Sequence, residues 1–390
     1  MRRVYLDNAA TTNCSSEVIN EMLPAFDTIY GNANSLHSFG RDAQGLVDRA
    51  RDRVAKAIGS KSNEVYFTSG GSEANNWAIK GVALANKDKG KHIITTKIEH
   101  DSVLESCKAL EQEGFEITYL NVDEYGLVNL AELMHQIRKD TILISVMMVN
   151  NEVGTIQNIK AIAKTAHERN IVFHTDAVQA VGAVKIDVED MEIDLLSMSA
   201  HKIYGPKGVG ALFIRNGIKC NDLIDGGEQE RKRRAGTVNV PAVAGFGRAI
   251  ETATRDIIVN QQKIKKIRDY FVKEITSKIA YTKINGHPFQ KVQGIINMGF
   301  EMVDSESLLM MLDLEGVAVS IGSACTSGVA EKSHVLKAMN VPEEYLKGSI
   351  RFSFGKNISK EDVDYAILKI VEIVARLRAI SPITKTGRAK

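Results

Sequence analysis

Short apolar segments alternate with amphipathic stretches between residues 64 and 252, and this alternation constrains the fold more than any other feature of the chain. The candidate strands are residues 64–68, 92–96, 117–121, 142–148, 171–175, 195–198 and 210–214. The candidate helices are residues 73–85, 101–112, 158–168 and 240–252. Strands that are apolar on both faces and separated by helices are typical of a mainly parallel sheet covered by helices. The sequence therefore predicts a large cofactor-binding α/β domain over residues 15–255.

The pattern changes after a long, charged helical stretch at residues 257–278, which is compatible with either side of a domain boundary. Beyond it, residues 295–298, 317–320 and 350–353 are candidate strands, and residues 305–314 and 360–377 are candidate helices. These segments predict a smaller α+β domain made of residues 1–14 and 256–380. The polar, basic residues 381–390 are expected to form a disordered tail.

The composition disfavours several classes of function. The 390 residues include 50 Lys+Arg and 48 Asp+Glu, so the formal charge of +2 gives no electrostatic reason to expect binding to nucleic acid or an anionic membrane. No stretch has the roughly 18 uninterrupted apolar residues of a membrane span, and the N-terminal residues lack the apolar core of a signal peptide. Four scattered cysteines with no Cys-x-x-Cys pair favour neither a disulfide framework nor a metal site, and they indicate a reducing cytoplasm.

A single lysine follows the predicted strand at residues 195–198, within Ser199-Ala200-His201-Lys202. Ligands of open parallel sheets bind at the carboxyl ends of strands, and a lysine there can form a Schiff base with an aldehyde cofactor. A surface lysine before a Gly-Pro turn is the alternative interpretation. The glycine-rich motifs of dinucleotide-binding and P-loop proteins are absent from the sequence, which disfavours those two classes.

Two other strand ends carry residues suited to such a cofactor. Asp176 follows an apolar strand, and an acid beside a pyridine nitrogen keeps the ring protonated as an electron sink; Gln179 could donate to a ring hydroxyl. A helix N-cap is the alternative interpretation of Asp176. Near residue 70, a strand meets the Gly-rich turn of Gly71 and Ser72 and then a helix, which makes a phosphate cradle or an ordinary capped turn.

These segments, together with others spread over the chain, resemble the motifs of one enzyme family. The further segments are residues 5–12, 30–32, 38–40, 99–100, 150–157, 199–208, 226–231, 236–237, 322–327 and 350–353. Over nearly its whole length the chain resembles the fold-type I pyridoxal-phosphate enzymes of the class V aminotransferase group. Within that group it is most similar to the NifS/IscS-like cysteine desulfurases. The resemblance implies an enzyme that converts L-cysteine to L-alanine with pyridoxal 5'-phosphate as cofactor.

The resemblance also implies roles for individual residues. Lys202 would form the Schiff base with the cofactor, Asp176 would pair with the ring nitrogen, and Gln179 would bond the ring hydroxyl. His100 would stack on the ring and shuttle protons, although a histidine after a strand is more often structural.

Two groups of residues would hold the phosphate and the substrate. The residues that would bind the phosphate are Gly71, Ser72, Ser199 and His201. They would be joined by Thr237 from the neighbouring subunit of an obligatory homodimer. Asn151 would contact cofactor and substrate, and Arg351 would pair with the substrate α-carboxylate. Asn151 could instead be a turn residue, and Arg351 could form a surface ion pair.

Among the four cysteines, Cys325 is the candidate sulfur acceptor. It lies in a small, polar, Gly-flanked segment typical of a mobile surface loop. The resemblance implies that its thiolate takes the substrate sulfur as a persulfide, and Cys325 could also be a transient cluster ligand. Cys107 fits a buried apolar position better. The spacing from Cys325 to residues 333–336 resembles the longer-loop subgroup, which implies donation to a sulfur-acceptor protein such as an iron–sulfur scaffold, or sulfur transfer for tRNA thiolation.

Two questions stay open from the sequence. A transaminase or selenocysteine lyase of the same group would keep Lys202 without depending on Cys325, and a non-catalytic sulfur-handling scaffold would keep the fold alone. The basic run of residues 231–234 is either a solvated loop or a site that attracts a phosphate or a partner's acidic face.

Overall fold

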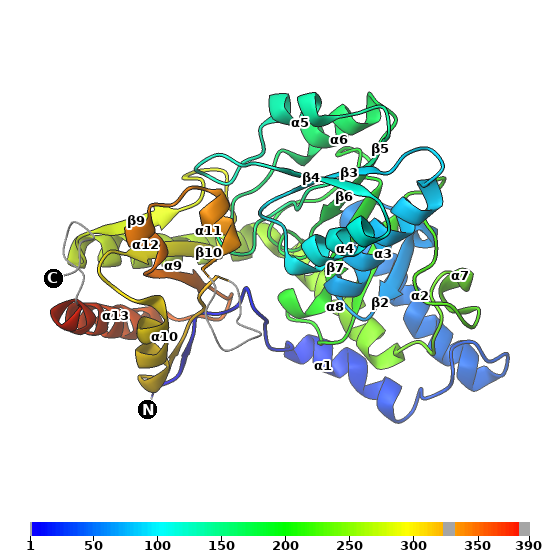
Figure 1. Cartoon of the computed structure of the whole chain (residues 1–390). Coiled ribbons are helices and arrows are strands. Elements are labelled where there is room, and N and C mark those ends of the chain that lie inside the picture. The colour runs from blue at the N-terminus through cyan, green and yellow to red at the C-terminus, as the bar shows by residue number, and fades with distance from the viewer. Residues whose placement is uncertain (1, 323–331, 382–390) are drawn as a thin grey trace.

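The computed structural model describes residues 2–322 and 332–381, and its largest sheet has seven strands in the order β2-β8-β7-β6-β5-β3-β4 (Figure 1). The strands are β2 (Val65–Thr68), β3 (His92–Thr96), β4 (Glu116–Leu120), β5 (Thr141–Ser145), β6 (Val172–Asp176), β7 (Leu195–Ser199) and β8 (Gly210–Ile214). In this sheet β8 is antiparallel to both of its neighbours, and the other neighbouring pairs are parallel. The prediction of a mainly parallel α/β sheet is confirmed.

Helices cover both faces of this sheet, which explains why its strands are apolar throughout. On one face, α2 (Ser38–Ile58), α6 (Ile159–His167) and α8 (Val240–Arg255) pack on inward residues such as Phe173 and Phe213. On the other face, α3 (Gly71–Asn86) and α4 (Asp101–Gln112) pack on strand residues such as Leu195 of β7 and Leu212 of β8. Successive strand residues point to opposite faces, so each strand contributes to two cores.

The strand predicted at residues 142–148 is shorter than expected. It ends at Ser145, beyond which the Met147 N–H donates to both carboxylate oxygens of Glu99, at 3.0 and 3.1 Å, and not to a β3 carbonyl. On the other side, the N–H groups of Val146 and Met148 still donate to carbonyls of β6, at 3.1 and 2.9 Å. The chain then turns toward the carboxyl edge of the sheet.

The remaining elements near this sheet are α1 (Ser16–Met22), η1 (Leu23–Phe26), η2 (Ser62–Glu64), α5 (Leu130–Gln136), η3 (Ala200–Lys202) and α7 (Gln229–Lys232).

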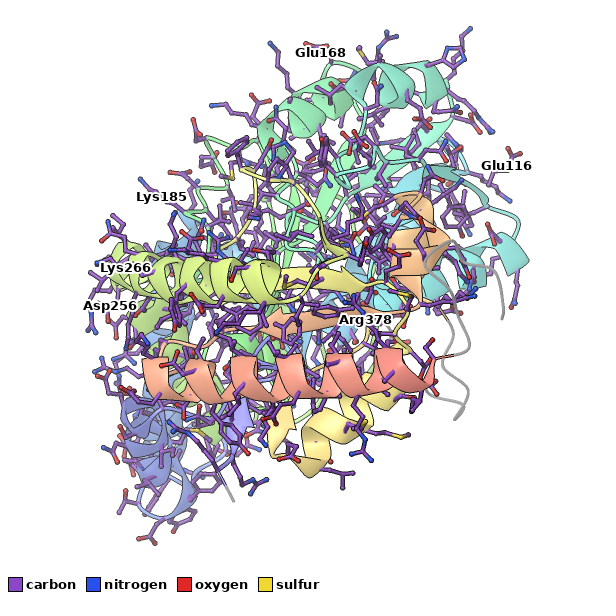
Figure 2. All side chains as sticks on the ribbon, turned by 90° about the vertical axis from the view of Figure 1, so that its left-hand side faces the viewer. Glu116, Glu168, Lys185, Asp256, Lys266 and Arg378 are labelled. Atoms are coloured by element: carbon purple, nitrogen blue, oxygen red, sulfur yellow. The ribbon has the colours of Figure 1, made fainter. Side chains whose placement is uncertain are left out.

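A second, smaller sheet is antiparallel, in the order β12-β10-β9, and β1 pairs in parallel with β11 beside it. Its strands are β1 (Val4–Tyr5), β9 (Thr282–Asn285), β10 (Ile295–Phe300), β11 (Val317–Ala318) and β12 (Ser349–Ser353). Its helices are α9 (Ile257–Lys278), α10 (Ser305–Leu314), α11 (His334–Ala338), α12 (Glu343–Leu346) and α13 (Lys360–Ile380). Figure 2 views this end of the molecule, where α9 and α13 lie side by side and share one apolar core with the sheet.

The division into residues 15–255 and residues 1–14 plus 256–380 remains a proposal. The pairing of β1 with β11 supports it, because the start of the chain returns to the smaller sheet. The tail predicted at residues 381–390 lies, apart from Ser381, outside the described residues. None of the helices in the described ranges combines the length and apolar character needed to cross a membrane.

A buried ion pair closes the β2 edge of the large sheet. Arg51 of α2 donates to both carboxylate oxygens of Glu230, at 2.6 and 2.7 Å, and to the Val65 carbonyl at 2.8 Å. Glu230 also accepts the Phe67 N–H at 2.9 Å, and both partners of the pair are buried. The segment that carries Glu230 is thereby held against an edge strand that would otherwise be open.

Arg51→Met is expected to lower the free energy of unfolding by about 3 kcal/mol, because it leaves the Glu230 carboxylate buried without its counter-charge. Urea denaturation of the variant and the wild type measures the difference. Arg49→Met is the matched control, since Arg49 is exposed on the same helix. Equal stability of the two variants would contradict this account of the β2 edge.

Candidate functional site

A cavity of about 540 Å³ lies at the carboxyl edge of the large sheet, where it meets the smaller sheet. Strands β3, β5, β6 and β7 run in the same direction, so the residues that follow them meet at this edge. The predicted site residues that line the cavity are Gly71, Ser72, His100, Asn151, Asp176, Gln179, Ser199, His201, Lys202 and Arg351. The structure thus brings together residues spread over 280 positions of sequence, from Gly71 to Arg351, while their roles remain predictions.

Lys202 lies on the short helix η3, directly after β7. Its Nζ donates to the carbonyl of Ala9 at 2.5 Å and to that of Ala10 at 2.7 Å. Burial, with a smaller contribution from the positive charge of Arg351, lowers the pKa of Lys202 to about 8. The interpretation as a surface lysine is therefore disfavoured, and the lowered pKa makes the neutral amine far more accessible near neutral pH than for an exposed lysine.

Asp176 ends β6 and is buried, with 5% of its surface exposed. Its Oδ1 accepts the Val178 N–H at 2.8 Å, and its Oδ2 accepts Nδ2 of Asn75 at 2.7 Å. The first contact is the one an N-cap makes, but a turn, not a helix, follows. Gln179 in that turn donates from Nε2 to the Ala9 carbonyl at 2.8 Å.

Another part of the cavity lining carries hydrogen-bond donors. Gly71 and Ser72 open α3, where backbone N–H groups have no partner within the helix, and Ser199 Oγ is buried without a hydrogen-bond partner among the described residues. Burial lowers the pKa of His201 to about 4, so its ring is neutral. A β-carbon on Gly71 would lie 2.6 Å from Val178 Cγ2, which leaves room only for glycine.

The cavity lining therefore combines two chemically different sets of groups with Lys202. One set is the neutral donors at a helix N-terminus, which suit a phosphate, and the other is the Asp176 carboxylate, which suits a protonated ring nitrogen. The unpartnered Ser199 hydroxyl is a donor that a phosphate oxygen would satisfy. These residues fit pyridoxal phosphate.

His100 is the N-cap of α4. Its Nδ1 accepts the Ser102 N–H at 3.1 Å and lies 2.9 Å from Ser102 Oγ. The ring is thus held by its own helix, in keeping with a structural role, and yet it lines the cavity.

Arg351 of β12 reaches the cavity from the smaller sheet. Its Nη1 donates to the Asn151 carbonyl at 3.1 Å, and its Nη2 donates to Asp7 Oδ1 at 2.9 Å. Arg351 is 5% exposed, and its Nε has no hydrogen-bond partner within the described ranges. The ion pair with Asp7 exists but is not on the surface, and a buried guanidinium with an unused donor is suited to a carboxylate ligand. Asn151 lies in the turn after β5, as the turn interpretation expected.

Cys325 lies outside the described residues, but the residues on both sides of that gap reach the cavity. Gly322 lines it, and a β-carbon on Gly322 would lie 2.2 Å from Glu152 Oε2. The same oxygen accepts the Ser333 hydroxyl at 2.5 Å. Burial raises the pKa of Glu152 above its usual range.

Thr237 is exposed and does not line this cavity in its own chain. It follows the basic run at residues 231–234, in which Arg231 and Lys232 are exposed and Arg233 and Arg234 are partly buried. Arg231 donates to the Val65 carbonyl at 2.7 Å, Arg233 pairs with Asp222, and Arg234 binds both oxygens of Glu73, at 2.8 and 3.0 Å. Each of these three guanidinium groups thus forms a hydrogen bond or an ion pair within its own chain.

Several cavity residues were missed from the sequence. Asn75 is hydrogen-bonded to Asp176, and Ser102 lies within hydrogen-bond distance of both Asn75 and His100. Asp7 accepts a hydrogen bond from Arg351, and Glu152 accepts one from Ser333. Helical spacing was a usable signal for Asn75, which lies four residues after Gly71 and so on the same face of α3. No local pattern distinguished the others.

Comparison with known proteins agrees with this geometry. The aminotransferase class-V family matches residues 4–366. The cysteine desulfurase IscS of Methanosarcina thermophila is 51% identical over 383 residues, which cover 98% of this chain and 95% of that protein. Among solved structures, a NifS-like protein superposes with a TM-score of 0.91 at 37% identity, covering 96% of this chain and 100% of that one. A structure of SspA in complex with cysteine has a TM-score of 0.80 at 35% identity, with 90% and 99% covered.

The lowered pKa of Lys202 predicts a specific pH dependence of stability in the cofactor-free protein. Between about pH 8 and pH 10.5 the unfolded chain binds more protons at this lysine than the folded chain, so the free energy of unfolding rises with pH. Relative to Lys202→Met, the wild type should gain roughly 2 kcal/mol between pH 7 and pH 10. Urea titrations at both pH values measure this, with Lys207→Met, at an exposed lysine of the same loop, as the control. A difference independent of pH would refute it.

Proposed function

The chain belongs to the aminotransferase class-V family as one of its pyridoxal-phosphate-dependent cysteine desulfurases, and on that premise we propose how its own residues perform the reaction. L-Cysteine is converted to L-alanine, and the sulfur atom passes to Cys325. The observation that carries the proposal is the single cavity in which Lys202, Asp176 and Arg351 meet, although they come from three different parts of the sequence.

When bound, pyridoxal phosphate supplies an aldehyde for covalent attachment and a ring that withdraws electrons. Lys202 would hold the aldehyde, because burial lowers its pKa to about 8 and so makes the nucleophilic neutral amine easier to form. Asp176, with one oxygen bonded by Asn75, would hold the ring nitrogen, and Gln179 the ring hydroxyl. The residues that would bind the phosphate are Gly71, Ser72, Ser199, His201 and the partner's Thr237.

Arg351 would bind the α-carboxylate of L-cysteine. Its position is set by Asp7 and by the Asn151 carbonyl, so the guanidinium is oriented before the substrate arrives. Asn151 lies beside it and would complete the substrate site. His100 would move protons at the substrate carbons through the nitrogen that does not face Ser102.

Cys325 would accept the sulfur. Its thiolate attacks the substrate sulfur, so that an S–S bond forms, the bond between carbon and sulfur breaks, and the carbon takes up a proton as alanine leaves. The product is a persulfide on Cys325. An external sulfur-acceptor protein, such as an iron–sulfur scaffold, would then receive the outer sulfur.

A homodimer would complete the site, with Thr237 reaching the phosphate of the neighbouring subunit. Large apolar side chains are exposed together on α1, η1, the following loop and the start of α2: Ile19, Leu23, Phe26, Tyr30, Leu36 and Phe39. α8, which begins three residues after Thr237, packs against α1, η1 and α2. An apolar patch of this kind next to Thr237 is suited to the dimer contact.

We place the enzyme in the cytoplasm. The three cysteines within the described residues, Cys14, Cys107 and Cys220, are free thiols. Free thiols are typical of a reducing compartment.

Cys325→Ala is expected to lose alanine release from L-cysteine by about 100-fold or more, because the sulfur then has no acceptor thiolate. The absorbance of the cofactor bound to Lys202 should be unchanged. Cys14→Ala is the matched control, and turnover should be that of the wild type. Full turnover by Cys325→Ala would refute the persulfide mechanism and favour a transaminase or a selenocysteine lyase, which assays with keto acids and selenocysteine separate.

Phe26→Asp is expected to shift the protein from dimer to monomer, because it places a charge in the apolar patch. Light scattering coupled to size exclusion measures the mass, and cofactor retention should fall with the loss of the partner's Thr237. Phe289→Asp is the control, since Phe289 is 88% exposed on a different part of the chain. A dimer that persists in Phe26→Asp would rule out this patch as the contact.

A further inference from the structure

A continuous chain of hydrogen bonds joins Asp176 to His100 along the wall of the cavity. Asn75 Nδ2 lies 2.7 Å from Asp176 Oδ2 and 2.8 Å from Ser102 Oγ. Ser102 Oγ in turn lies 2.9 Å from Nδ1 of His100. Asn75 belongs to the second turn of α3 and Ser102 to the first turn of α4, and these two helices pack against each other. The two residues therefore link the predicted ring-nitrogen partner to the predicted proton shuttle.

The direction of every bond in this chain is determined. A carboxylate only accepts hydrogen bonds, so Asn75 must turn its amide nitrogen toward Asp176. The second hydrogen of that amide goes to Ser102 Oγ. Because His100 Nδ1 accepts the backbone N–H of Ser102, the Ser102 hydroxyl is the donor in its contact with the same nitrogen. The Ser102 backbone N–H donates to the same nitrogen at 3.1 Å. With two donors directed at Nδ1, the neutral ring must carry its hydrogen on Nε2.

The buried amide of Asn75 is costly to the fold. Asn75 is 1% exposed, and its Oδ1 has no hydrogen-bond partner among the described residues. A buried acceptor left unsatisfied costs about 1–3 kcal/mol, and an apolar side chain of similar size would avoid that cost. Packing between α3 and α4 therefore does not account for an asparagine here, whereas a link between Asp176 and Ser102 does.

We propose that Asn75 and Ser102 are positioning residues that hold His100 as the Nε2–H tautomer. In this form Nε2 is the nitrogen that exchanges protons with the substrate, and within the described ranges it has no other hydrogen-bond partner. The same chain couples the tautomer to the charge of Asp176. This inference rests on the proposed function, in which His100 moves protons.

The test is ¹⁵N NMR of the histidine-labelled holoenzyme at a pH above the range in which imidazole rings titrate. His100 is assigned from the signals that disappear in His100→Gln. In the wild type, one of its nitrogens should be protonated (Nε2) and the other unprotonated (Nδ1). In Ser102→Ala both resonances should move toward the averaged position of two exchanging tautomers. Ser102→Thr keeps the hydroxyl and should restore the wild-type signals.

Ser106→Ala is the matched control, because Ser106 lies one turn further along α4 and bonds only the Ser102 carbonyl, at 2.7 Å. It should leave the His100 signals unchanged. Asn75→Leu keeps the volume of the side chain but removes the amide. It should shift the signals in the same direction as Ser102→Ala but less, since the Ser102 N–H still donates to Nδ1.

Turnover is measured on the same samples. Ser102→Ala should lower kcat for alanine release roughly 5- to 10-fold with KM changed by less than about 2-fold, since the correct tautomer is then only partly populated. Unchanged His100 signals in Ser102→Ala, in an active and folded enzyme, would overturn the proposal. Lack of alanine release by the wild type would instead overturn the proposed function, and the wild-type nitrogen signals distinguish the two failures.

Discussion

Three neighbouring strands of the large sheet are joined by a buried imidazole as well as by backbone hydrogen bonds. His174 in β6 contacts Ser145 Oγ of β5 through Nδ1, at 2.8 Å, and Ser197 Oγ of β7 through Nε2, at 3.0 Å. Burial lowers the pKa of His174 to about 3, so the ring stays neutral and bridges the two hydroxyls. A slip in register would leave these buried polar groups unsatisfied. The bridge therefore supports the register that places Asp176 opposite Ser197 at the end of its strand.

The chemistry of the cavity follows from this alignment. The sheet edge supplies Asp176 and Lys202, the first turn of α3 supplies Gly71 and Ser72, the N-cap of α4 supplies His100, and β12 of the smaller sheet supplies Arg351. Burial, with a smaller contribution from the nearby positive charge of Arg351, lowers the pKa of Lys202, so the lysine loses its proton more easily. The proposed site thus needs both sheets, since Lys202 and Asp176 come from one and Arg351 comes from the other.

Regular periodicity made much of the fold predictable. The strand at residues 210–214 and the helices at 101–112, 257–278 and 305–314 have the predicted bounds. The strand expected to reach residue 148 stops at Ser145, beyond which a buried carboxylate far away in sequence, Glu99, takes the Met147 N–H. The basic run at residues 231–234 was ambiguous for a similar reason. Its arginines bind partners from β2 and α3 that no local pattern identifies.

By itself the sequence determined the order of strands and helices, the residue types at each strand end and the family to which they belong, because these depend on local periodicity and on motifs that are contiguous along the chain. Only the tertiary structure decided which side chains contact one another. The link from Asp176 through Asn75 and Ser102 to His100, and the clamp of Asp7 and Asn151 on Arg351, join residues up to 344 positions apart. Hydrogen bonds of about 3 Å depend on the packing of helices and sheets against one another, which residue spacing along the chain does not specify.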